Sequence, residues 1–257
     1  MVRPITAAIL LSTLSLFMIF TASLHAQGPV LVPPMPSPGP GVIPPPPPPP
    51  ISADVLDRHT FKVSPIERTG PGQYKIGDIL VNATDKSVSF PAVINMDKGL
   101  LEYLLVRTAG KTHESLLRTK IEPYNLQVAC LLVGLVGTDK PLGFQGAPET
   151  PQGDQVEIAL RHGKTYEVVQ PEKWLTQTID GIKHDVPPLR WVFTGSIVRN
   201  GRLAAQVGGS IISIYHDPVA MFDNASPGGQ SNKIWFVKEG AVPPVGTPVT
   251  VTIKAKK

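Results

Sequence analysis

A run of prolines divides this chain of 257 residues into two parts of different character. Residues 28–50 hold 13 of its 29 prolines, and Pro44 to Pro50 follow one another without a break. Proline fixes φ near the polyproline value and cannot donate a hydrogen bond to a β-ladder, so such a segment cannot join a packed core. We therefore expect a disordered, proline-rich linker over residues 27–52 and a single folded domain over residues 53–257.

The first 26 residues predict export. Arg3 precedes an apolar run from Ile5 to Leu24, and the small residue Ala26 follows it. A basic start, an apolar core and a small residue before the cut are typical of a secretory signal peptide. The length of the run is also close to that of a membrane-spanning helix, about 20 residues, so a retained membrane anchor is the alternative. Either way we expect a periplasmic or extracellular domain that meets the membrane only through this segment.

The composition argues against several partners and cofactors. The formal net charge is +4, but lysine and arginine form no block before the last four residues, so nothing indicates nucleic-acid binding. Cys130 is the chain's one cysteine. It can form no disulfide within the chain and cannot supply the four thiolates of a typical iron–sulfur cluster. Its apolar neighbours predict a buried thiol, and we predict no cofactor.

Most of the domain is expected to form short strands, because apolar runs of four to ten residues alternate with turn residues. The predicted strands are residues 73–81, 88–95, 100–106, 156–160, 166–169, 189–198, 203–207, 210–215, 233–237 and 248–253. Within the first of them, Gly77-Asp78 predicts a bend. Asn200-Gly201 predicts a tight hairpin.

Two or three helices interrupt the strands. The clearest spans residues 123–136, where Pro123 suits a first helical turn and Gly137 follows the end. It is apolar nearly all round, which predicts burial. Residues 171–177 and 217–222 predict shorter helices. Strands and helices do not alternate regularly, so we expect a β-rich α+β domain, with two packed, mostly antiparallel sheets, one buried helix (about 123–136) and one or two short helices.

Polar side chains concentrate directly after the predicted strand 100–106. Lys111, Thr112, His113, Glu114 and Ser115 combine a cation, a base, a carboxylate and two hydroxyls. Rigid scaffolds often present function on such loops. His113 and Glu114 are weak candidates for metal ligands, and His113 could act as a base beside Ser115. The alternative is that these side chains hydrogen-bond a tight loop.

Two further clusters are binding candidates. Thr194 and Ser196 flank Gly195 in a strand, where glycine permits a close approach of backbone or a bulge. His216 and Asp217 precede a proline, and Asp217 could cap a helix. The sequence contains no Gly-x-Ser-x-Gly elbow and no His or Cys pair at metal-ligand spacing, so a catalytic residue cannot be named.

Several of these segments resemble the YdjY-domain family of exported bacterial proteins. The resemblance runs from about Ser64 to the C-terminus, and its most specific stretch is Gly-Lys-Thr-His-Glu-Ser-Leu-Leu at residues 110–117. Phe-Thr-Gly-Ser at 193–196 and His-Asp-Pro at 216–218 also fit. The resemblance implies an exported location and a shared site around His113. It implies no reaction, and the ferredoxin-like label of some members does not suit a chain with one cysteine.

Three functions follow from these observations. The first is a non-catalytic module that binds an unknown envelope or extracellular ligand or partner, and the sequence favours it. The second is a hydrolase or a metal-assisted enzyme centred on His113, in which His113 would lie within reach of a partner such as His216 or Asp217. The third is a purely structural envelope domain, in which the polar groups are satisfied locally.

Overall fold

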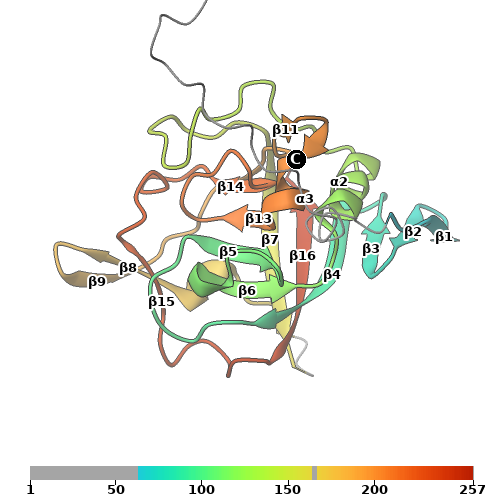
Figure 1. Ribbon diagram of the computed structural model, residues 1–257. Coiled ribbons are helices and arrows are strands. Elements are labelled where there is room, and N and C mark those ends of the chain that lie inside the picture. The colour runs from blue at the N-terminus through green and yellow to red at the C-terminus, as the bar shows by residue number, and fades with distance from the viewer. Residues whose placement is uncertain (1–62, 164–166, 257) are drawn as a thin grey trace, which may run out of the picture. The chain divides into compact units, whose positions relative to one another are not determined.

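Figure 1 shows the computed structural model of the protein, which describes residues 63–163 and 167–256. The predicted signal or anchor (1–26) and the predicted linker (27–52) lie outside the described residues. No helix in the described part combines the length and the apolar character that crossing a membrane requires.

Eight strands form a closed barrel, around which the rest of the domain is arranged. In spatial order they are β4 (Ser87–Ile94), β16 (Pro248–Ala255), β7 (Asp154–His162), β10 (Trp191–Phe193), β14 (Phe222–Asn224), β13 (Ser210–Ser213), β5 (Tyr103–Arg107) and β6 (Ser115–Thr119). β6 also pairs with β4, at Val93 and Ile94, so the order returns to its starting strand. Closure leaves no free edge in this ring of strands.

The prediction of two packed sheets is therefore wrong, although most pairings in the ring are antiparallel, as expected. In β4 every second residue from Val88 to Ile94 is buried, and this alternation is expected equally for a sandwich and for a barrel. Two parallel pairings complete the ring, β5 with β6 and β13 with β14. Parallel neighbours have no hairpin turn between them, so local turn signals do not reveal how the sheet closes.

Other strands extend or flank the barrel. β1 (Ile66–Gly70), β2 (Gln73–Ile76) and β3 (Ile79–Asn82) continue the sheet outward from β4. The single strand predicted over residues 73–81 is instead the β2–β3 hairpin, because Gly77 has a φ of 58° and turns the chain back. β15 (Trp235–Val237), β8 (Leu175–Ile179) and β9 (Ile182–Asp185) form a separate sheet. The predicted Asn200-Gly201 hairpin is confirmed as β11 (Val198–Arg199) and β12 (Arg202–Leu203).

The helices are shorter and less buried than predicted. α2 (Pro123–Leu132) ends four residues before the predicted boundary, and only one face is covered, because Leu126 and Ala129 are buried while Leu131 is 56% exposed. The prediction of one buried helix over about 123–136 is therefore wrong. η2 (Pro171–Trp174) is a 3-10 turn, and α3 (Ala204–Gly208) stands where a strand is predicted. No helix forms at residues 217–222, which turn directly into β14.

The hydrophobic core fills the barrel and continues under α2. Fully buried side chains from its strands include Phe90, Leu105, Phe193 and Phe222. Cys130 of α2 belongs to the same cluster and is completely buried, which confirms the prediction for the thiol, and burial raises its pKa. A protonated, enclosed thiol behaves as a small apolar side chain.

Candidate functional site

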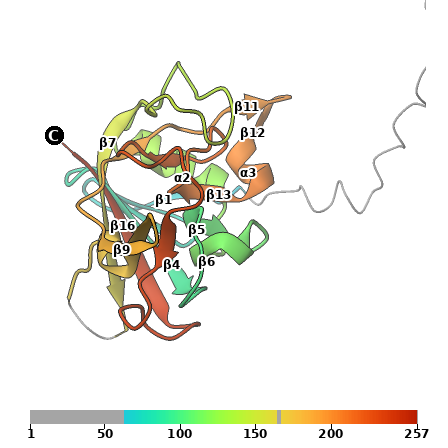
Figure 2. The ribbon, with the colours of Figure 1, turned by 90° about the vertical axis from the view of Figure 1, so that its left-hand side faces the viewer.

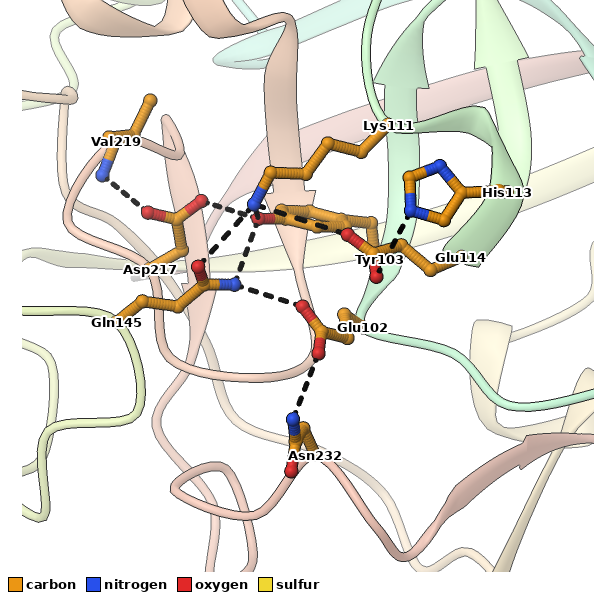
Figure 3. Close-up of polar contacts among 9 residues, drawn as sticks. All are labelled: Glu102, Tyr103, Lys111, His113, Glu114, Gln145, Asp217, Val219 and Asn232. Carbon is orange, nitrogen blue, oxygen red and sulfur yellow. Dashed lines mark hydrogen bonds and ion pairs between the residues drawn. The ribbon is translucent and has the colours of Figure 1, made fainter.

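The connection between β5 and β6 gathers the polar side chains of the candidate site (Figure 3). The two strands are parallel neighbours, so residues 108–114 must return the chain from the end of β5 to the start of β6. This connection is shorter than the dozen or more residues of a usual parallel crossover, and it has to follow the strand closely. Its 3-10 turn η1 (Thr112–Glu114) leads into Ser115, which pairs with Tyr103 at the start of β5. Lys111 is thereby placed beside Tyr103.

Lys111, Tyr103 and Asp217 form a chain of hydrogen bonds (Figure 3). Lys111 Nζ donates to Tyr103 Oη at 2.7 Å and lies 4.9 Å from the centroid of the ring. Tyr103 Oη donates to Asp217 Oδ2 at 2.7 Å, and Asp217 Oδ1 accepts from the backbone N–H of Val219 at 2.9 Å. Burial, followed by the charge of Asp217, raises the pKa of Tyr103, which keeps the phenol protonated. A buried tyrosine thus joins two segments that the sequence presents as separate candidates.

A second chain of hydrogen bonds begins at Glu102, the residue before Tyr103. The Glu102 carboxylate accepts from Gln145 Nε2 at 2.9 Å and from Asn232 Nδ2 at 3.1 Å. Gln145 Nε2 is also 3.2 Å from Tyr103 Oη, and Lys111 Nζ is 3.4 Å from Gln145 Oε1. The amide of Gln145 therefore links the two series of hydrogen bonds, and Gln145 and Asn232 together tie two distant loops to the start of β5.

His113 and Glu114 occupy the solvent side of this polar cluster. The His113 side chain is 79% exposed, whereas the Glu114 side chain is 18% exposed. His113 Nε2 is 3.6 Å from Glu114 Oε2, and Lys111 Nζ is 4.0 Å from Glu114 Oε1. Burial raises the pKa of Glu114, repulsion from Glu102 adds to the rise, and the nearby Lys111 and His113 oppose it. His113 contacts a carboxylate, but that carboxylate is its own neighbour in sequence.

The predicted hydroxyl groups hold backbone segments in place. Three of these hydroxyl groups donate to a backbone carbonyl oxygen: Ser115 to Leu117 at 2.7 Å, Thr194 to Ala220 at 2.9 Å, and Ser196 to Val219 at 2.6 Å. Thr112 contributes its backbone carbonyl, which accepts from Asn95 Nδ2 at 2.6 Å. A hydroxyl that donates to a carbonyl is not poised to give its proton to a base such as His113.

His216 and Asp223 fix the segment that carries Asp217. The buried ring of His216 lies between two backbone carbonyl oxygens, with Nδ1 2.7 Å from that of Ala147 and Nε2 3.0 Å from that of Asn224. The fully buried Asp223 accepts from the backbone N–H groups of Asp217 at 3.0 Å and Asn224 at 2.8 Å. Burial raises the pKa of Asp223 to about 7. Both ring nitrogens of His216 are thus engaged by backbone rather than directed toward His113.

The metal candidates, His113 and Glu114, are neighbours in space as in sequence. Within residues 63–163 and 167–256, no group of three or more His, Cys, Asp or Glu side chains is arranged to hold a metal ion. The polar cluster around Tyr103 offers hydrogen-bond donors and acceptors rather than a set of convergent metal ligands.

A cavity of about 620 Å³ opens on another part of the domain, where α2, α3 and the β11–β12 hairpin meet. Figure 2 shows α3 beside this hairpin. The cavity wall includes apolar side chains such as Leu203 and Val207, and it also includes the predicted candidates Thr194 and Ser196. Gln127 of α2 lines the same wall, and its Oε1 is buried without a hydrogen-bond partner.

Backbone geometry shapes the floor of this cavity. Gly195 and Ser196 both adopt the left-handed region, with φ of 81° and 61°, so the chain leaves β10 in a sharp turn. The close approach of backbone occurs at Gly137, where an added Cβ would lie 2.6 Å from the Thr194 carbonyl oxygen. Gly137 is thus the glycine that allows two backbone segments to approach closely, whereas Gly195 provides the turn.

The polar cluster contains residues that sequence reasoning missed. Glu102 was visible as the one charge in an apolar strand, but Tyr103 looks like an ordinary core residue. Gln145 and Asn232 lie in loops that follow Glu102 by 43 and 130 positions along the chain. Gln127, which lines the cavity, had no signal beyond its position on the predicted helix.

Comparison with known proteins agrees with the resemblance seen in the sequence. A family model described as the YdjY domain matches residues 79–254. Neither the curated proteins nor the solved structures include a match to this chain. The match runs from the start of β3 into β16, so it includes the eight barrel strands, the polar cluster and the cavity. The chain belongs to the YdjY-domain family.

Proposed function

We propose that this protein is an exported, non-catalytic binding module, whose ligand occupies the cavity between α2, α3 and the β11–β12 hairpin. The observation that carries the proposal is the cavity itself. Its volume of about 620 Å³ falls within the range of small-molecule sites, and its lining combines apolar side chains with charged and polar ones. Thr194 and Ser196, two of the predicted binding residues, contribute to its wall.

The polar cluster supports a binding function over an enzymatic one. Its tyrosine, two of its carboxylates and its amide side chains already hydrogen-bond one another, as the bonds among Tyr103, Glu102 and Gln145 illustrate. Such a saturated network holds loops in place but presents no activated nucleophile. We assign it the role of fixing the β5–β6 connection and the segment around Asp217.

The exported location rests on the sequence of residues 1–26. Cleavage after Ala26 would release the domain with its linker, and a retained segment would tether it. N-terminal sequencing of the mature protein is expected to begin at Gln27. A mature chain that begins at Met1 and fractionates with membranes would support the tether, and one that stays in the cytoplasm would contradict export.

Filling the cavity is expected to weaken binding strongly. Val207 lines it and is 50% exposed, so Val207→Trp places a large ring at its mouth with little effect on the core. With 1-methoxynaphthalene as a neutral apolar probe, we expect at least a roughly tenfold loss of affinity, since an occupied pocket cannot bury the probe's apolar surface. Amide chemical shifts of the isotope-labelled full chain give both the affinity and the residues contacted.

Val245→Trp is the matched control, because Val245 is 52% exposed and does not line the cavity. Wild type and Val245→Trp should show the same shifts in α2 and α3. If Val207→Trp binds the probe as well as Val245→Trp does, the cavity is not the ligand site and the proposed function is wrong.

A further inference from the structure

We infer that the cavity recognises an uncharged molecule with an apolar body and one hydrogen-bond donor, which pairs with the side-chain amide of Gln127. This inference rests on the proposed function and specifies its class of ligand. Three features of the wall carry it: the pairing of its partly buried cation, the engagement of its other polar side chains, and the unpaired oxygen of Gln127.

The partly buried cation of the cavity wall, Arg107, is paired before any ligand arrives. Arg107 Nη2 contacts Glu122 Oε1 at 2.5 Å, and the two side chains are 24% and 17% exposed. At the rim, the exposed Arg202 and Asp139 carry opposite charges. An ionised ligand would lose hydration on entering the cavity, and the partly buried Arg107 is already paired and offers it no free counter-charge. The wall therefore suits a neutral molecule.

Most polar side chains of the wall are already committed. Gln206 Nε2 donates to Glu122 Oε2 at 2.6 Å, and Gln206 Oε1 accepts from the backbone N–H of Tyr124 at 2.9 Å. Ser196 Oγ donates to Val219 and accepts from the backbone N–H of Ala205 at 3.0 Å. These groups shape the wall, but their hydrogen bonds are directed into the protein.

Gln127 differs from them. Of the buried side-chain nitrogen and oxygen atoms in the part of the chain that the structure describes, Gln127 Oε1 is the one without a hydrogen-bond partner. Native proteins pair nearly all such atoms, and an exception calls for a physical reason. Gln127 lines the cavity while its Oε1 is buried, so the inference requires the terminal amide to rotate when a ligand binds. A donor on the ligand would then supply the hydrogen bond that the free protein lacks.

The apolar residues of the cavity wall indicate what the apolar part of the ligand would contact. Val198 and Val207 are 68% and 50% exposed in the free protein, and they flank the opening with Tyr124 and Leu203. Covering them would remove apolar surface from water. The volume leaves room for a body of one or more rings or for a branched alkyl group.

Three naphthalene probes of similar shape separate these requirements. 1-Naphthol offers an O–H donor, 1-methoxynaphthalene offers none, and 1-naphthoate carries a negative charge. Titrations of the labelled full chain should give about fivefold tighter binding of 1-naphthol than of 1-methoxynaphthalene, the factor that one net hydrogen bond provides. 1-Naphthoate should bind more weakly than both.

Gln127→Met keeps the length of the side chain and removes the amide, so the preference for 1-naphthol should fall to about onefold. Gln155→Met, at an exposed glutamine outside the cavity, should keep it. Equal binding of the two neutral probes to wild type, a preference that persists in Gln127→Met, or tightest binding of 1-naphthoate would overturn the inference while leaving the cavity as a ligand site. Failure of all three probes to bind would instead contradict the proposed function.

Discussion

The ionisation of the buried Asp223 is expected to remove about 4 kcal/mol of stability from the folded chain as the pH rises from 4 to above 7. Asp223 is fully buried in β14, and burial raises the pKa of its carboxyl group from 3.8 to about 7. Each pKa unit corresponds to about 1.4 kcal/mol, and the rise is about three units. The hydrogen bonds from Asp217 and Asn224 limit the rise but do not cancel it.

The sign follows from where the proton binds. The folded state holds a proton on Asp223 at pH values where the unfolded chain has already lost it, so folding is favoured by acid in this window. The stabilisation is fully present below about pH 4 and is lost as the pH passes through 7. Glu114, whose pKa is also raised, acts in the same direction, whereas the exposed Asp185, whose pKa is lowered by Lys238, acts in the opposite one.

Urea unfolding of the full chain at pH 4.5, 6.0 and 8.0 measures this dependence, and Asp223→Asn isolates it. The amide cannot ionise, so the variant's free energy of unfolding should change less between pH 4.5 and 8.0 than that of wild type, whatever its absolute stability. Asp78→Asn, at an exposed carboxylate, is the matched control and should retain the wild-type dependence. Parallel curves for wild type and Asp223→Asn would show that Asp223 does not titrate in this range.

Local patterns were enough to predict most strands of this fold but not how they combine. β4, β13 and β16 appear close to their predicted ranges, and Asn200-Gly201 forms its hairpin, because alternation and turn chemistry are properties of neighbouring residues. Closure of the barrel depends on the parallel β5–β6 and β13–β14 pairs. Which strands become parallel neighbours is decided by packing across the whole domain, and no short segment encodes it.

The candidate site was likewise predictable only in part. Its loop was visible, because Lys111, His113 and Glu114 stand out after an apolar strand. The central residue of the site, Tyr103, could not be predicted, because it is completely buried and looks like a core residue. Its hydroxyl group contacts Asp217, 114 positions away in the sequence, only in the folded chain. The cavity was equally hidden: its wall depends on the helix α3, where alternation predicts a strand, and on the exposed side of α2.

Removing one hydroxyl tests whether the polar cluster stabilises the fold. Tyr103→Phe is expected to lower the free energy of unfolding by about 2–3 kcal/mol, the effect of deleting a hydrogen bond to a buried charged group. The variant leaves Asp217, which is 3% exposed, without the donor at 2.7 Å, and it takes the 2.7 Å acceptor away from Lys111. The ring itself still fills its place in the core. Urea unfolding at pH 7 gives the difference.

Tyr74→Phe makes the same chemical change on β2, outside the polar cluster, and should alter stability by less than about 0.5 kcal/mol. Because Tyr103 does not line the cavity, Tyr103→Phe should also bind 1-methoxynaphthalene with wild-type affinity once folded. Equal stability of the two variants would mean that the Lys111–Tyr103–Asp217 chain does not stabilise the fold. Lost probe binding in a folded Tyr103→Phe variant would mean that cluster and cavity act as one site, so the two measurements together separate a stabilising network from a ligand-binding one.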